Sequence, residues 1–227
     1  MGKLRIISET GEPFSDRLEA GRMLAGELRG ISGEKPVVLG IPRGGVIVAN
    51  EIATELVAEF DIVLSHKLGA PANPELAIGA VCEDGSVFVD RRIASYVGAD
   101  EQYIDKQRQL QLDALTHRAQ MYRQIRPKLS LANRLVIVTD DGVATGATMQ
   151  AALWAIKQEK PQRIIAALPV GPLEIMTKLS AAADETICLR VPPFFEALSR
   201  FYLSFEQVDD RQLLDILRQQ TRTKAKT

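Results

Sequence analysis

Two adjacent carboxylates, Asp140 and Asp141, follow an aliphatic run at 135–138 and stand directly before a loop rich in Gly, Ala and Thr. The aliphatic run predicts a buried parallel strand, and in an open α/β sheet the ligand crevice lies outside the carboxyl ends of such strands. Carboxylates at that place can accept hydrogen bonds from hydroxyl groups or hold a cation. We therefore expect Asp140 and Asp141 to contact a ligand rather than to pack.

The loop behind these carboxylates predicts an anion site. Its glycines and alanines let backbone N–H groups approach an anion closely, its threonines add hydroxyl donors, and the helix that follows contributes its positive N-terminal end. The loop consists of Gly142, Val143, Ala144, Thr145, Gly146, Ala147 and Thr148. Carboxylates and an anion loop side by side suit a ligand with neighbouring hydroxyls near a terminal phosphate, which is the chemistry of ribose 5-phosphate.

The stretch 135–148, LVIVTDDGVATGAT, resembles the 5-phosphoribosyl-1-pyrophosphate (PRPP) binding motif of type I phosphoribosyltransferases. That motif has hydrophobic residues, two acidic residues and then a Thr-Gly-x-Thr loop. The resemblance implies that Asp140, Asp141 and residues 142–148 bind PRPP. Ala144 departs from the family, which usually has a hydroxyl or carboxyl side chain there. An ordinary strand that ends in a solvated acidic turn is the alternative interpretation.

A second motif, Pro42-Arg43-Gly44-Gly45, follows a short apolar run at 37–41 and resembles the pyrophosphate loop of the same family. Gly44 and Gly45 allow backbone donors to reach a diphosphate, and Arg43 can hydrogen-bond it and neutralise its charge. The resemblance also implies a cis peptide bond between Pro42 and Arg43. Lys67, expected just beyond a strand at 61–65, resembles a lysine that the family places near the leaving group. A solvated lysine that caps a strand is the alternative.

From about Phe14 to Leu217 the chain resembles a group of bacterial phosphoribosyltransferases that contain IPRGG, KLGAPxNPELAIGAV and DDGxATGAT. The resemblance implies transfer of ribosyl 5-phosphate from Mg²⁺–PRPP to a nitrogen acceptor, with release of pyrophosphate. The implied catalytic residues are Arg43, Lys67, Asp140 and Asp141. Both aspartates are also the implied contacts of Mg²⁺, directly or through water. The acceptor, a nucleobase or a small amine, is left unnamed.

Two other functions compete with the transferase. A regulatory protein could keep the fold and sense PRPP without turnover, since fold alone does not establish activity. Ala144 bears on the acceptor instead, because an alanine cannot act as a general base or hydrogen-bond the acceptor. An unrelated phosphate hydrolase is disfavoured, since the chain has neither a GxxxxGK[ST] loop nor a candidate nucleophile.

The composition predicts one domain of a water-soluble α/β protein. The chain has 227 residues, is 46% hydrophobic and 25% charged, and carries a formal net charge of −1, which indicates no broad basic surface for nucleic acid. No apolar run is long enough to span a membrane, so we expect a cytoplasmic protein. Formation of a homo-oligomer is a separate possibility. Cys82 and Cys188 stand alone, without the spacing of a zinc site or a disulfide framework, and are expected to be core thiols.

The predicted fold is type I phosphoribosyltransferase-like, with a mostly parallel central sheet flanked by helices, a hairpin and flexible-loop insertion, and a small hood from the chain termini. The single domain, residues 1–227, has its core at about 36–191 and hood candidates at 1–35 and 192–227. Strands are expected at 37–41, 61–65, 78–82, 86–90, 135–138, 163–170 and 186–191, and helices at about 15–28, 46–59, 99–126, 148–157, 173–182 and 209–219. Aromatic residues concentrated at 194–205 serve packing or cover the acceptor side of the crevice.

Overall fold

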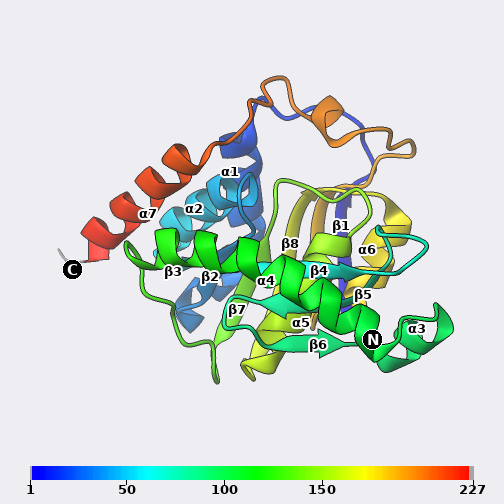
Figure 1. Cartoon of the computed structure of the whole chain (residues 1–227). Helices are drawn as coiled ribbons and strands as arrows, with labels where there is room; N and C mark the ends of the chain where they lie inside the picture. Colours follow the sequence, from blue (N-terminus) through cyan, green and yellow to red (C-terminus); the bar gives the residue numbers. More distant parts are fainter. Residues whose placement is uncertain (1, 225–227) are drawn as a thin grey trace.

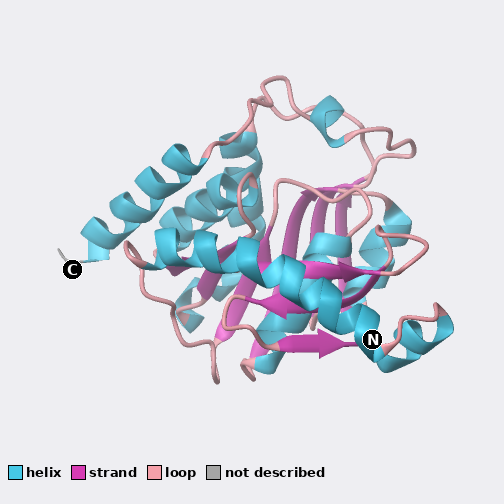
Figure 2. Ribbon diagram, viewed as in Figure 1, coloured by secondary structure: helices cyan, strands magenta, loops and turns pink. Residues whose placement is uncertain are grey.

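A six-stranded parallel sheet forms the centre of the protein (Figures 1 and 2), for which a computed structural model describes residues 2–224. The strand order is β1-β9-β8-β7-β2-β3, and every neighbouring pair is parallel. The strands are β1 (Lys3–Ser8), β2 (Val37–Gly40), β3 (Glu59–Ile62), β7 (Leu135–Thr139), β8 (Arg163–Val170) and β9 (Glu185–Arg190). The predicted parallel α/β sheet is confirmed.

Helices cover both faces of this sheet. One face packs against α1 (Arg17–Leu28) and α2 (Gly45–Leu56), and the other against α5 (Ala147–Gln158) and α6 (Leu173–Ser180). In β7 the Ile137 side chain joins the first apolar cluster, whereas its neighbours Val136 and Val138 join the second. Because both faces of the strand are buried, its sequence is a continuous aliphatic run and does not alternate between apolar and polar residues.

A smaller antiparallel sheet packs against α5, with the order β4 (Ser65–Gly69), β5 (Ala77–Cys82) and β6 (Val87–Val89). It contains the predicted hairpin and is also contacted by the long helix α4 (Glu101–Arg123), which the short helix α3 (Arg91–Tyr96) precedes. The strand predicted at 61–65 is wrong, because β3 ends at Ile62 and a separate strand begins at Ser65. The chain leaves the central sheet there: the carbonyl of Leu64 accepts from the N–H of Glu83, and β4 then pairs with β5.

Two segments far apart in the chain, residues 9–16 and 192–208, lie side by side above the sheet (Figure 1). Phe14 N–H donates to the Phe201 carbonyl (2.9 Å), and Leu203 N–H donates to the Phe14 carbonyl (2.8 Å). We call these two segments the hood. It includes the 3₁₀ helix η2 (Leu198–Phe201), and α7 (Asp210–Lys224) continues from it to pack against α2.

Much of the N-terminal stretch assigned to the hood from sequence belongs instead to the core. Residues 3–8 form β1, which pairs in parallel with β9, and Leu4 and Ile6 pack against the apolar cluster beneath the sheet. Helix α1 and the 3₁₀ helix η1 (Arg29–Glu34) then complete one layer. The sequence of residues 3–8 does not by itself predict a strand, since this edge strand is short, has no fully buried residue and does not alternate regularly between buried and exposed positions. Across residues 2–224, none of the helices has the length and apolar character needed to cross a bilayer.

Candidate active site

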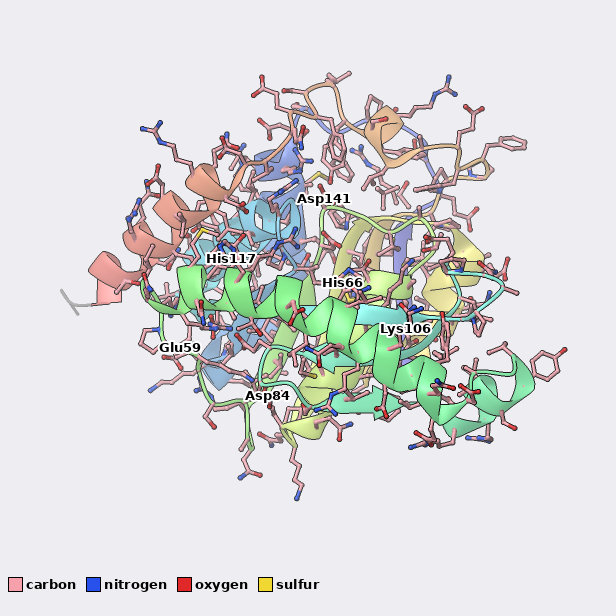
Figure 3. The ribbon with its side chains drawn as sticks, in the orientation of Figure 1. Glu59, His66, Asp84, Lys106, His117 and Asp141 are labelled. Atoms are coloured by element: carbon pink, nitrogen blue, oxygen red, sulfur yellow. The ribbon has the colours of Figure 1, made fainter. Side chains whose placement is uncertain are left out.

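The site lies where the direction of the chain through the sheet reverses. Strands β2 and β7 are neighbours; the chain goes from β2 outward to β3 on one side, and from β7 to β8 and β9 on the other. Loops at the carboxyl ends of such strands diverge and leave a crevice between them. The Pro42–Gly45 loop follows β2 and the Asp140–Gly146 loop follows β7. Figure 3 shows Asp141 at this end of the sheet, below the hood.

The two motifs predicted from sequence are in direct contact. A β-carbon built on Gly44 would lie 1.9 Å from Asp141 Oδ2, and one on Gly45 would lie 2.9 Å from Asp140 Oδ1 and 2.7 Å from its Cα. Only glycine leaves room for carboxylates at these distances. The peptide bond between Pro42 and Arg43 is cis, as predicted. The glycines thus bring the acidic pair against the second loop.

Asp141 is held by groups from the N-terminal helix and the hood. Its Oδ2 accepts a hydrogen bond from Arg17 Nε at 2.8 Å, and its backbone carbonyl accepts from the Tyr202 hydroxyl at 2.5 Å. The Arg17 side chain is 9% exposed and that of Asp141 12%, so this ion pair is nearly buried. Arg17 also donates to the Glu206 carbonyl and stacks on Phe205, its Cζ atom 3.9 Å from the ring centroid. Asp141 therefore joins the β7 loop to the hood.

Asp140 is half-buried and, among residues 2–224, forms no ion pair within 4.0 Å. Its Oδ1 accepts the N–H of Asp141 at 2.8 Å. Burial, and then the negative charge of Asp141, raise the pKa of Asp140 well above its usual range, while the nearby Arg17 opposes the shift. A divalent cation would offset both effects. Asp140 thus suits an Mg²⁺ ion that takes one or two carboxylate contacts and completes its shell with water and substrate oxygens.

The anion loop has the geometry that its sequence predicts. Gly142 and Gly146 have positive φ angles of 148° and 74°, and α5 begins directly afterwards at Ala147. Ala144, Thr145 and Thr148 are exposed and lie at a helix N-terminus, where a ligand can reach them. Val143 does not fit the prediction that all residues of the loop 142–148 bind the ligand.

The side chain of Val143 is buried, and its N–H donates to the Val170 carbonyl at 3.0 Å, so neither is available to a ligand. The exposed residues of the loop are free of this constraint. We attribute the difference to packing, because Val143 fills the space beside Gly171 in the apolar cluster below the loop.

The two predicted cations occupy different environments. Arg43 is half-buried and forms no ion pair within the described residues 2–224. Burial and then the hydrogen bond to Asp210 raise the pKa of Tyr122, and the charge of Arg43 only slightly opposes this rise. Lys67 lies within β4 and not after a strand of the central sheet, which corrects the sequence prediction. Its Nζ is 2.9 Å from Glu75 Oε1, and Glu75 lines a cavity together with Thr145 of the anion loop.

Three residues at the site carry no signal in the sequence that identifies them: Arg17, Glu75 and Tyr202. Arg17 occupies the first turn of an ordinary helix, and no motif distinguishes it from other arginines. Glu75 lies inside the NPEL phrase, to which the sequence assigns no separate role. Tyr202 belongs to the aromatic group at 194–205, which the sequence relates to packing. Its contact with the site is made by its hydroxyl, which donates to the Asp141 carbonyl.

The aromatic cluster of the hood is largely a packing unit. Phe195 stacks on Phe201 with ring centroids 5.1 Å apart, and Tyr202 stacks on Phe205 at 5.0 Å. Phe194 alone among these five is highly exposed, at 84%. These contacts fix the segment that carries Tyr202 and Phe205 over the acidic pair.

Comparison with known proteins agrees with this geometry. A family model described as a phosphoribosyl transferase domain matches residues 16–205. Two Mycobacterium tuberculosis proteins assigned as phosphoribosyl transferases, MT0597 (strain CDC 1551 / Oshkosh) and Rv0571c (strain ATCC 25618 / H37Rv), are each 39% identical over 204 residues, 90% of this chain. The chain spans only 46% of the length of these relatives. The crystal structure of TT1426 from Thermus thermophilus is 45% identical, with a TM-score of 0.86 over 91% of this chain and 98% of that one. The chain belongs to the phosphoribosyl transferase family.

Proposed function

We propose that this protein transfers ribosyl 5-phosphate from Mg²⁺–PRPP to a nitrogen acceptor, a nucleobase or a small amine, and releases pyrophosphate. The observation that carries the proposal is the contact between the acidic pair and Gly44-Gly45 at the reversal point of the sheet. The anion loop begins at the same strand end, so groups suited to hydroxyls, pyrophosphate and phosphate converge on one crevice.

The residues suit a reaction in which charge separates. When the bond between the anomeric carbon and the pyrophosphate oxygen breaks, positive charge grows on the ribosyl ring and negative charge on the leaving group. Asp140 and Asp141 stabilise the first charge, and Arg43 and Lys67 the second. The nitrogen lone pair forms the new bond to the anomeric carbon, the electrons of the broken bond leave with pyrophosphate, and the surplus proton passes from the nitrogen to pyrophosphate or water. No nucleophilic side chain is required.

The anion loop holds the 5-phosphate in this scheme. Its residues Ala144, Thr145 and Thr148 are exposed at the start of α5, where the helix dipole favours negative charge. Mg²⁺, held by Asp140 directly or through water together with substrate oxygens, would neutralise charge on the pyrophosphate. The protein's own contribution is to bind and orient both ends of PRPP.

A PRPP-binding regulator without turnover is the second candidate. Exposed Ala144 provides no acid or base for an acceptor, and the Arg17 guanidinium engages one carboxylate of the pair. Both observations favour binding over chemistry.

One experiment separates these two functions. The protein is incubated with Mg²⁺–PRPP and a panel of nucleobases and small amines, and pyrophosphate release is measured. Release that depends on one acceptor is the expected result and establishes the transferase. PRPP binding by calorimetry without release in any mixture would favour the regulator, and absence of PRPP binding would reject both.

A further inference from the structure

Glu75 lies between two groups that are expected to bind phosphates. Lys67 Nζ is 2.9 Å from Glu75 Oε1. The hydrogen bond and charge of Lys67 lower the pKa of Glu75. Thr145, which lines a cavity together with Glu75, belongs to the loop before α5, whereas Lys67 belongs to β4. One carboxylate therefore links the predicted pyrophosphate side of the site to the predicted 5-phosphate side.

The loop that carries Glu75 is closed by its own hydrogen bonds. Ala70 N–H donates to the Leu76 carbonyl at 2.9 Å, and Leu76 N–H donates to the Asn73 carbonyl at 3.0 Å. The Asn73 side chain accepts from Glu75 N–H at 3.1 Å, which makes an Asx turn. The backbone thus positions Glu75, and the ion pair with Lys67 is not needed to hold the loop.

A cavity of about 270 Å³ lies beside the anion loop, and Glu75 forms part of its wall together with Thr145, Gly146 and Ala147. Carboxylates and phosphoryl groups use the same donors, namely ammonium groups, hydroxyls and N–H groups at a helix N-terminus. Two anions cannot share these donors without mutual repulsion. A phosphate that binds at Thr145 or Lys67 consequently meets Glu75 as a competitor.

We propose that Glu75 determines the anion affinity of this site: its carboxylate occupies Lys67 beside Thr145 of the anion loop, and the phosphate groups of a ligand bind by displacing it. The identity of the ligand as PRPP rests on the proposed function, whereas competition with inorganic anions does not. Displacement leaves the Asx turn intact and moves only the side chain, which is 64% exposed and therefore free to rotate into solvent.

The test measures the Kd of inorganic pyrophosphate and of Mg²⁺–PRPP by calorimetry for the wild type, Glu75→Gln and Glu75→Ala. Removing the competing charge is expected to lower both Kd values about two- to fivefold at low ionic strength, the range that exposed ion pairs provide. The gain should shrink as salt screens the charges. Since the side chain is exposed, the urea midpoint should stay unchanged.

Asp215→Asn is the matched control. Asp215 is also exposed and paired, 2.8 Å from Arg218, so its replacement makes the same change in net charge on helix α7. Its Kd values are expected to equal those of the wild type. A second control repeats Glu75→Gln in a Lys67→Met background, where the gain should be smaller because one of the contested donors is absent.

The outcomes are distinguishable from those of the proposed function. Tighter pyrophosphate binding in both Glu75 variants, with no response to PRPP in any protein, supports the role of Glu75 and rejects the transferase. Wild-type binding of PRPP with unchanged Kd values in both Glu75 variants overturns the role of Glu75 alone. An equal gain in Asp215→Asn, or no anion binding by any variant, also overturns it.

Discussion

The α-carbon of Gly44 and the carboxylate of Asp141 are so close that a single methyl group cannot be placed between them. A β-carbon on Gly44 would lie 1.9 Å from Asp141 Oδ2 and 3.1 Å from Arg17 Nε. The side chains of Asp141 and Arg17 cannot move away easily, because they form an ion pair with each other and both are nearly buried. The glycine is therefore as much a part of the site as the charged residues.

Gly44→Ala should disrupt this contact and weaken Mg²⁺–PRPP binding by at least about tenfold, since a displacement of about 1 Å within a site costs on the order of 10²-fold. Overpacking should also reduce the free energy of unfolding by about 1–3 kcal/mol. Calorimetry and urea unfolding measure the two effects. Gly26→Ala in α1, where a β-carbon meets nothing within 4 Å, is the control and should bind normally. Normal PRPP binding by Gly44→Ala would remove this loop from the site.

Asp141→Asn should destabilise the protein by about 3 kcal/mol, because removing one partner of a buried ion pair leaves the other charge uncompensated. The same change should weaken Mg²⁺–PRPP binding by at least about 1.5 kcal/mol, the lower end for a hydrogen bond to a charged group. The double variant Arg17→Met/Asp141→Asn should lose less free energy of unfolding than the sum of the losses in the two single variants. Urea unfolding of all four proteins gives the coupling energy, and strict additivity would show that the pair contributes nothing.

Asp140→Asn should stabilise the protein while it abolishes Mg²⁺-dependent PRPP binding. The folded pKa of Asp140 is raised above its ordinary value of 3.8, so the folded state binds more protons than the unfolded state between these two pKa values. The stability associated with the protonated form is therefore lost as the pH rises through the folded pKa. Asparagine keeps the acceptor for Asp141 N–H and carries no charge.

The expected gain from Asp140→Asn is about 0.5–2 kcal/mol at neutral pH. It should vanish as the pH falls below the ordinary value of 3.8, where the wild-type carboxyl is protonated in both the folded and the unfolded state. Urea unfolding at several pH values measures the difference, and a variant less stable than the wild type at neutral pH would contradict the raised pKa.

An inorganic phosphate or sulfate ion should bind against the backbone of residues 144–148, with the hydroxyls of Thr145 and Thr148 as further donors. Crystal structures determined in the presence of either anion, with the ion located from the electron density alone, provide the measurement. Ions found repeatedly elsewhere, with this loop empty, would count against the assignment of the 5-phosphate site.

The two thiols should resist alkylation in the folded protein. Cys188 is fully buried and burial raises its pKa to about 12; Cys82 is also buried, with a pKa raised for the same reason. Because the thiolate is the reactive form, iodoacetamide near neutral pH should modify neither residue until urea unfolds the chain. Mass spectrometry before and after unfolding counts the modified thiols. Rapid labelling of the native protein would show that these positions are open to solvent.

The sequence was most informative where local chemistry and backbone geometry coincide. The aliphatic run before Asp140 predicts β7 because both of its faces are buried, and glycines next to carboxylates predict close approach. These features depend on a few adjacent residues. The confirmed cis bond at Pro42 and Arg43 came from the family resemblance and not from the residue pattern itself.

What could not be predicted depends on partners far apart in the chain. Arg17 contacts Asp141 across 124 residues, and no local pattern selects it among the arginines of the sequence. Glu75 lies beside Thr145 only because the smaller sheet packs against α5. The place of Lys67 was wrong for the same reason: whether a strand continues or begins anew depends on the strand it pairs with, here β5.

The hood contact of Arg17 requires a part of the chain that is made late in protein synthesis. Arg17 bonds the carbonyl of Glu206, 189 residues later in the chain. At about 5–20 residues per second, Glu206 leaves the ribosome several seconds after Asp141. Arg17 and Asp141 can thus pair on the nascent chain before Phe205 has been made. The crevice can be covered only after synthesis of the second segment of the hood.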